Sequence, residues 1–198
     1  MSFFQGALPK TALARACRMA GFSLMELVIT LAIFAVLAAI AIPSMTTLMN
    51  ANRLSGATNE MIATLQLARM EAVRLNAPVT VCRSDDGATC KSGELWSTWI
   101  MLADADRDGV VDDVLRVSTA AAPLEVRASA AIQDSQLSFR SDGLAKAANG
   151  SPLFARLAIC QQVTQPAENE RLITLAAGSR ISSEPIVAAG KCATPTNS

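Results

Sequence analysis

The sequence predicts an α+β protein, in which one long N-terminal helix, transmembrane in its first half, packs on a C-terminal antiparallel β-sheet or sandwich. Three observations predict this class. Residues 22–42 form a largely apolar run with a single charge, apolar positions at helical spacing continue to residue 75, and short strand signals separated by turn residues fill the remainder. A long helix followed only by strands is typical of α+β domains.

The apolar run is long enough to cross a bilayer, because its 21 residues span about 32 Å as a helix and the hydrocarbon core is about 30 Å thick. Lys10, Arg15 and Arg18 precede the run, and no basic residue follows it for ten positions. The positive-inside rule therefore predicts that residues 1–21 are cytoplasmic and that the body lies on the other side of the membrane.

Glu26 is the anomaly in this run, since a carboxylate inside the hydrocarbon core is costly. A secretory signal peptide, cleaved after Ala39-Ile40-Ala41, and an ordinary signal anchor both fit the apolar pattern. Neither explains a charge at this position. A segment that retains Glu26 must supply the carboxylate with a partner.

The helical pattern becomes amphipathic after Pro43 and ends at Asn76-Ala77-Pro78. It predicts one helix over residues 23–75, within a segment 22–76 that precedes a globular domain of residues 77–198. The apolar positions of its second half recur every three or four residues, as expected for a face turned to a core. They are Leu54, Ala57, Met61, Leu65, Ala68 and Ala72.

Short apolar segments between Gly, Asp, Ser and Asn predict the strands of the globular domain. Within the second of these strands, Trp96 and Trp99 are three residues apart and are expected on opposite faces, one in the core and one exposed as a subunit contact. The predicted strands are 78–83, 95–103, 110–119, 124–129, 136–140, 153–161 and 171–176, with a weaker signal at 185–188.

The composition argues against an enzyme and against a protein that coats nucleic acid. The chain has no histidine, so a serine or cysteine nucleophile would lack its usual base. Its formal net charge is zero, with 17 basic and 17 acidic residues. Without the three basic residues of 1–21, the remainder has 14 basic and 17 acidic residues, a net charge of −3, whereas nucleic-acid-binding domains show a basic excess.

Five cysteines stand at positions 17, 82, 90, 160 and 192. If Cys17 is lost with the basic leader, the body keeps four, none in a CxxC spacing. Two structural disulfides in an oxidising compartment are favoured over free buried thiols.

The segment Asp104, Asp106, Asp108 and Gly109 has the D-x-D-x-D-G spacing that opens an EF-hand-like calcium loop, with Asp112 at the ninth position. The twelfth position is Leu115 rather than glutamate. We therefore favour a solvated hairpin turn, and calcium held by these four aspartates is the alternative. The sequence requires no other cofactor.

Residues 21–27, G-F-S-L-M-E-L, followed by an apolar stretch and Pro43, resemble the class III signal of type IV pilins and type II secretion pseudopilins. The resemblance implies that a prepilin peptidase removes leader residues 1–21 by cutting after Gly21 and that Phe22 is N-methylated. Glu26 and Pro43 become the fifth and twenty-second mature residues, both in agreement with the family pattern. In a filament core, the neighbouring subunit's terminal amine would neutralise Glu26, whereas in the membrane the carboxylate would reach the headgroups.

The body resembles the FimT and FimU minor pilins and the GspH pseudopilins. The matching stretches are L-A-R-M-E-A-V-R-L-N-A-P-V-T-V-C (67–82), D-D-G-A-T-C (85–90), W-S-T-W-I (96–100), D-A-D-R-D-G-V-V-D-D (104–113), L-S-F-R-S-D-G (137–143) and A-G-S-R (177–180). The resemblance implies a minor pilin that helps to initiate or cap type IV pilus assembly. A GspH-type pseudopilin of the type II secretion system and a pilus-tip subunit that binds DNA are the alternatives.

The same resemblance implies the partners and the location. Other minor and major pilins or pseudopilins and the prepilin peptidase/N-methyltransferase are the expected partners. The subunit is expected as a single-pass protein of the inner membrane with a periplasmic domain, and then in the pilus or pseudopilus. It also favours the disulfides Cys82–Cys90 and Cys160–Cys192, the pairing that closes the shortest loops.

DNA-capturing FimT-like proteins carry a late G-R-x-R motif, for which this chain has Gly178-Ser179-Arg180-Ile181-Ser182. Ser179 and Ile181 occupy the two arginine positions of the motif, and the single arginine, Arg180, lies between them. Arg171 and Lys191 are expected nearby, but Glu168, Glu170 and Glu184 offset them. Because affinity for DNA grows with the number of neutralised phosphates, we expect weak or no binding.

Overall fold

The computed structural model describes residues 21–106, 113–147 and 151–197. The chain forms two compact units, Met1–Ile42 and Pro43–Ser198, which are described separately below. Helix α1, Leu24–Leu75, has residues in both units, with Pro43 inside it. The structure confirms the predicted α+β class.

Helix α1 ends where its sequence predicts. The backbone of Asn76 is left-handed, with a φ of 52°, and the Ala77 N–H donates to the Ala72 carbonyl at 3.2 Å. This is the usual way in which a helix satisfies its last carbonyl groups. Pro78, which follows, cannot continue the helical hydrogen bonds.

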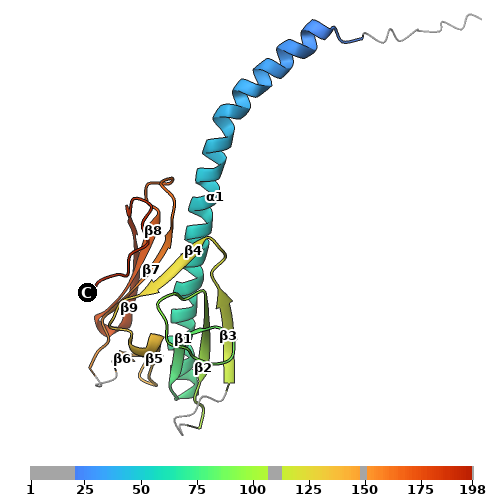
Figure 1. The fold of residues 1–198 in the computed structure, drawn as a ribbon. Helices are drawn as coiled ribbons and strands as arrows, with labels where there is room; N and C mark the ends of the chain where they lie inside the picture. The colour runs from blue at the N-terminus through green and yellow to red at the C-terminus, as the bar shows by residue number, and fades with distance from the viewer. Residues whose placement is uncertain (1–20, 107–112, 148–150, 198) are drawn as a thin grey trace, which may run out of the picture. The chain divides into compact units, whose positions relative to one another are not determined.

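Two antiparallel sheets follow α1 (Figure 1). Sheet A has the order β3-β2-β1-β5-β6, and sheet B has the order β4-β7-β8-β9. The strands of sheet A are β1 Val79–Ser84, β2 Thr98–Ala103, β3 Asp113–Thr119, β5 Gln136–Phe139 and β6 Ala145–Lys146. Those of sheet B are β4 Leu124–Ala128, β7 Ala155–Gln161, β8 Glu170–Ala176 and β9 Arg180–Ile186. Two short 3₁₀ turns complete the described elements, η1 Gln133–Ser135 and η2 Ala177–Ser179.

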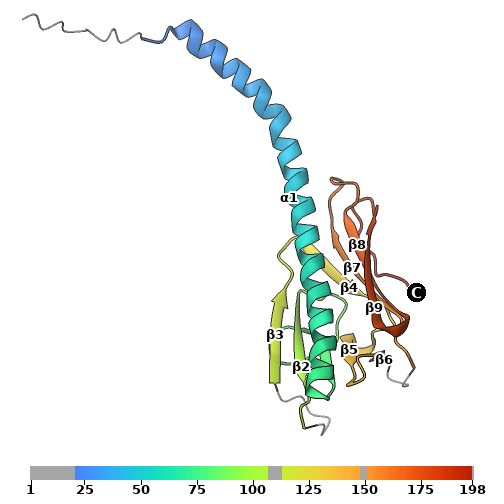
Figure 2. The same cartoon turned by 180° about the vertical axis from the view of Figure 1, so that it is seen from behind.

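The core lies between the second half of α1 and both sheets, and the view from behind shows this half of the helix running along the strands (Figure 2). Five of the six predicted apolar positions of α1 are buried, and Ala57 is partly buried. Thr58 and Thr64 are also buried, which the apolar pattern did not predict. Their hydroxyls donate to the carbonyls of Leu54 and Glu60, so the helix itself satisfies them.

Most strand predictions agree with the structure to within a few residues. The exceptions are β9, which begins at Arg180 rather than at 185, and the two-residue β6, which was not predicted. Strand β9 alternates few apolar residues because it is an edge strand with both faces largely exposed. Positions 110–112 of the third predicted strand lie outside the described residues.

The prediction that one tryptophan is exposed was wrong, because Trp96 and Trp99 are 0% and 1% exposed. Strand β2 begins only at Thr98, so the alternation of faces does not extend back to Trp96. The backbone N–H of Trp96 instead donates to the Val126 carbonyl of β4 at 2.9 Å. Trp96 is thus held by sheet B and Trp99 by sheet A, and both lie in the core that the sheets share.

Both disulfides expected from the family resemblance are present, Cys82–Cys90 and Cys160–Cys192. The first closes a loop over the outer face of sheet A, where Cys82, Ile100 and Leu102 form a second small buried cluster. The second fastens the C-terminal segment to β7. The loop closed by Cys90 and the terminal segment contain little regular structure, so the cross-links hold them in place.

Candidate functional site

The first half of α1 is the most unusual surface of the molecule, because its apolar side chains are exposed. Phe22 is 81% exposed, Leu24 80% and Phe34 70%. The helix is long and apolar enough to cross a membrane, with a mean hydropathy of 2.6 in its best 18-residue window, none of which is buried. A globular protein in water does not leave this much apolar surface uncovered, so lipid or another chain must cover it.

Glu26 lies in the first turn of α1, where the positive end of the helix dipole favours a carboxylate. Phe22 precedes it by one helical turn, just outside the helix, and a Cβ added at Gly21 would meet nothing within 4 Å. Within the described residues, nothing covers the backbone of Gly21 at the expected cleavage site. The roles of Gly21, Phe22, Glu26 and Pro43 in processing and assembly remain predictions.

A polar cluster ties sheet A to α1. The Arg116 Nη2 donates to Glu60 Oε1 at 2.8 Å, and the Ser118 hydroxyl donates to the same oxygen at 2.6 Å. The Ser118 hydrogen bond, followed by Arg116, holds the pKa of Glu60 below its usual range. The cluster fixes the edge strand β3 against the helix.

Arg180 lies at the turn between β8 and β9 and is exposed. Gly178 and Ser179 form this turn with φ values of 68° and 58°, so both take the left-handed conformation that a tight turn requires. The turn contacts α1, because Arg69 Nη1 donates to the Ser179 carbonyl at 3.3 Å.

The two arginines line one groove of about 360 Å³, which we call the arginine groove. Arg69 was missed by the sequence analysis, because on a helix with many charged positions no spacing marks it as the neighbour of a turn 110 residues later. The groove is lined by Gln66, Arg69, Met70, Ser179, Arg180 and Ile181.

The expectation that Arg171 and Lys191 lie near Arg180 was wrong. Arg171 pairs with Pro185 and Ala176 with Arg180, so Arg171 is five residues, or about 17 Å, along the strand from the turn. Lys191 lies at the same end of the hairpin as Arg171, away from the turn. Its N–H donates to the Ala188 carbonyl, and the Ala188 N–H donates to the side chain of Asn169, which precedes β8. The register of the β8–β9 hairpin places Arg171 and Lys191 far from Arg180, and the sequence alone does not specify this register.

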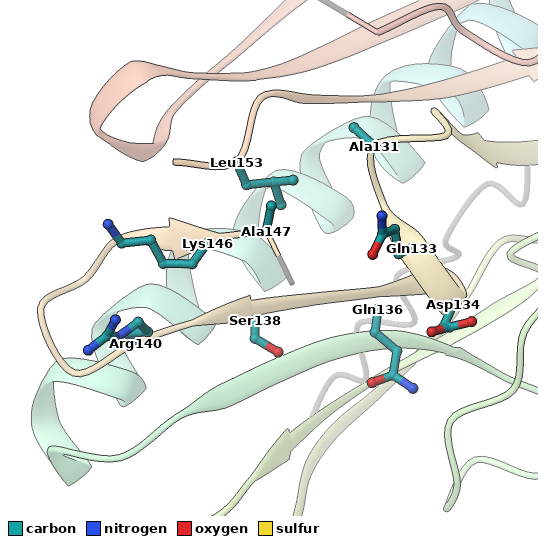
Figure 3. Close-up of a pocket in the computed structure, with 9 residues that line it drawn as sticks. All are labelled: Ala131, Gln133, Asp134, Gln136, Ser138, Arg140, Lys146, Ala147 and Leu153. Carbon is teal, nitrogen blue, oxygen red and sulfur yellow. The ribbon is translucent and has the colours of Figure 1, made fainter. Parts of the chain in front are cut away.

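A second hollow of about 320 Å³ lies beside β5 and β6, with polar side chains along it (Figure 3). Arg140 and Lys146 lie at one end and Asp134 at the other. These groups can hydrogen-bond a ligand, but the lining places no activated nucleophile beside a base. It consists of Ala131, Gln133, Asp134, Gln136, Ser138, Arg140, Lys146, Ala147 and Leu153.

Two groups of potential metal ligands occur in the chain, and the structure describes only part of the first. Of the calcium candidates, Asp104 and Asp106 are described, whereas Asp108 and Asp112 lie outside the described residues. Glu125, Cys160 and Cys192 offer ligand atoms within 4.8 Å of one another. The two cysteines share a disulfide, however, and so have no thiolate with which to bind a metal.

Comparison with known proteins gives two sequence matches. The family described as type II transport protein GspH matches residues 57–178, and the prokaryotic N-terminal methylation motif matches residues 17–42. A search of curated protein sequences finds no significant relative.

Two solved structures are similar in fold, both crystal forms of the type IV minor pilin FimU from Pseudomonas aeruginosa PAO1. The first is 24% identical, covers 68% of this chain and 90% of the FimU chain, and has a TM-score of 0.51. The second is 23% identical, covers 67% and 93%, and has a TM-score of 0.48. At this identity the first structure shows a shared fold.

Proposed function

The chain belongs to the GspH family, and from this premise we propose that it is a minor pilin that helps to initiate or cap type IV pilus assembly. Proteins of this family are pilins and pseudopilins, structural subunits rather than enzymes. The observation that carries the proposal is the exposed apolar half of α1 with Glu26 in its first turn. The methylation motif at 17–42 supports the same proposal, in which this helix passes from the membrane into a filament core.

The proposed maturation is cleavage after Gly21, which removes residues 1–21, and N-methylation of Phe22. Before assembly, residues 22–42 anchor the subunit in the inner membrane with a cytoplasmic N-terminus and a periplasmic globular domain. After assembly, the terminal amine of a neighbouring subunit neutralises Glu26, because a buried carboxylate without a partner would cost several kcal/mol. The partners are thus the prepilin peptidase/N-methyltransferase and the other pilins.

The alternative is a GspH-type pseudopilin of a type II secretion system, which would use the same exposed helix. Within this resemblance, the two cysteine pairs favour the pilus branch over the secretion branch. Deleting the gene separates the two functions. We expect surface pili to be lost and secretion of exported enzymes to be unchanged, whereas the reverse result would assign the chain to secretion.

DNA capture remains the second alternative, and we expect weak or no binding at physiological salt. The turn that corresponds to the DNA-binding motif offers Arg180, to which the fold adds Arg69, so about two phosphate contacts are available. A mobility-shift titration with duplex DNA tests this expectation. Tight binding that falls steeply with salt and is lost in Arg180→Ala would make DNA capture the better assignment.

A further inference from the structure

The arginine groove is formed by segments far apart in the sequence. Residues 66–70 come from α1, and residues 179–181 come from the β8–β9 turn. The turn is fixed from two sides, because the Ser179 carbonyl accepts from Arg69 and the Ser179 hydroxyl accepts from the Ala145 N–H at 2.6 Å. The groove is therefore part of the folded domain rather than a chance gap beside a loose loop.

Arg69 is held in place before any ligand arrives. Its guanidinium bonds the Ser179 carbonyl, and its side chain lies beside the β5–β6 turn, where a Cβ added to Gly143 would be 3.3 Å from Arg69 Nε. One hydrogen bond uses one of five guanidinium N–H groups, so most of the donors remain available. A cation fixed in this way loses little conformational freedom when it binds an anion.

The charge of the groove is not balanced within the described residues. Neither Arg69 nor Arg180 belongs to any ion pair there, although Arg74, Arg83, Arg116, Arg127 and Arg171 all do. No residue that lines the groove is acidic. Two arginines therefore share one groove, on a mature chain of net charge −3, without an anion between them.

The rest of the lining indicates what kind of anion fits. Met70 is 61% exposed and Ile181 is partly buried, so the groove combines two cations with apolar surface. A protein segment can direct one carboxylate side chain to the two guanidinium groups, while neighbouring side chains of the same segment contact Met70. An extended polyanion would gain nothing from the apolar part of the lining.

We infer that the arginine groove binds an aspartate or glutamate side chain of a neighbouring filament subunit, an inference that rests on the proposed function. The bond is a charge-assisted arginine–carboxylate contact, a pair whose geometry allows two parallel hydrogen bonds. It gives the globular domain a contact of its own with the next subunit. This contact is distinct from the helix pairing at Glu26.

The test replaces Arg180 with lysine in the full-length chain, expressed in cells that assemble the filament and lack the native copy. A water-soluble carbodiimide joins a lysine amine to a carboxylate in direct contact, forming an amide and releasing a urea that takes up the oxygen. Ser183→Lys is the matched control, because Ser183 is exposed on the same strand but does not line the groove. Sheared filaments are treated, digested and analysed by mass spectrometry.

We expect the lysine introduced by Arg180→Lys to be joined to an aspartate or glutamate of a different subunit, several-fold more often than the lysine introduced by Ser183→Lys. Filaments that contain the Arg180→Lys chain without such a cross-link would overturn the inference and leave the proposed function intact. Absence of the wild-type chain from filaments would refute the proposed function and the inference with it.

Arg180→Glu provides a second readout, since the side chain is exposed and its replacement leaves the core unchanged. We expect its incorporation into filaments to fall about tenfold, as for the loss of one charge pair. Lys191→Glu, at the far end of the hairpin, should incorporate normally. Equal incorporation of both variants, or tight salt-sensitive binding of duplex DNA by the wild-type chain that Arg180→Glu abolishes, would reject a carboxylate partner.

Discussion

Helix α1 contains two stretches rich in apolar side chains, residues 24–42 and residues 54–72, and the chain buries apolar side chains only in the second. Leu37 is 61% exposed, whereas Leu65 is 1% exposed and belongs to the core cluster that includes residues of both sheets. Burying a leucine side chain contributes about 1.5–3 kcal/mol. In the second half the globular domain supplies this free energy, and in the first half it must come from lipid or from other subunits.

The two halves of the helix therefore differ in what they stabilise: the second half contributes to the stability of the globular domain, and the first half is available for contacts with lipid or other chains. From position 54 on, apolar residues recur every three or four positions, so one face of the helix packs on the core and the other is exposed to water. Between 24 and 42 they surround the helix on all sides. A helix that is apolar all round needs an apolar environment all round. Mutations in the two halves should therefore fail in different assays.

Glu26→Ala should have the largest effect, and only on assembly. Membrane insertion should remain, because removing a charge makes the segment more apolar. Incorporation into filaments should be lost, since the partner amine would be buried without a counter-charge. Fractionation of membranes and sheared filaments measures both. Normal incorporation of the variant would contradict the charge-pairing argument.

A pair of leucine substitutions tests the comparison of the two halves directly. Leu65→Ala should lower the free energy of unfolding of the globular domain by about 2–5 kcal/mol, because it leaves a cavity in the core. Leu37→Ala should leave that free energy unchanged in detergent. Urea unfolding of the full-length protein, followed by tryptophan fluorescence, measures both, since Trp96 and Trp99 are buried in the domain. Equal losses would show that the halves are not independent.

Removing the disulfides should cost the globular domain an intermediate amount. The sequence separations of 8 and 32 close loops of 9 and 33 residues, counting both cysteines, and loop entropy predicts losses of about 2.6 kcal/mol for Cys82–Cys90 and about 3.7 kcal/mol for Cys160–Cys192. Double alanine variants of each pair, unfolded in urea, test the order. Non-reducing peptide mapping that joined Cys82 to Cys160 would overturn the pairing.

Glu60→Gln should have the smallest effect. Ser118 and Arg116 hold the pKa of Glu60 below its usual range, so the stabilisation is present above the unfolded-state pKa and is lost as the pH falls through the folded-state pKa. Because the pair is more than one-third exposed, we expect a loss below about 1 kcal/mol at neutral pH. The difference from wild type should shrink below about pH 4. Glu94→Gln, at a side chain 87% exposed, serves as the control and should change nothing.

The elements carried by local periodicity could be predicted from the sequence. Helix α1 was placed to within one residue at its start and at its end, since its apolar spacing and the Asn76 stop are local signals. The strands with buried alternation were found as well. Strand β9 was largely missed, because an exposed edge strand carries little apolar pattern.

What depends on tertiary register could not be predicted. Trp96 hydrogen-bonds to sheet B, whereas Trp99 belongs to a strand of sheet A, because the chain bends between them. The apolar pattern of the sequence does not indicate that bend. Arg69 meets Arg180 only because the β8–β9 turn packs on α1. The processing residues, in contrast, come from a contiguous motif that the fold does not alter.

The central claim is that residues 22–42 leave the membrane as part of the finished subunit. Intact-mass and N-terminal analysis of the protein extracted from membranes and filaments tests it most directly. The account predicts a chain that begins at Phe22, lacks residues 1–21 and carries one additional methyl group, and it predicts that a bulky residue at Gly21 leaves the precursor uncut. A mature protein that begins at Ile42, after signal-peptide cleavage, would contradict it.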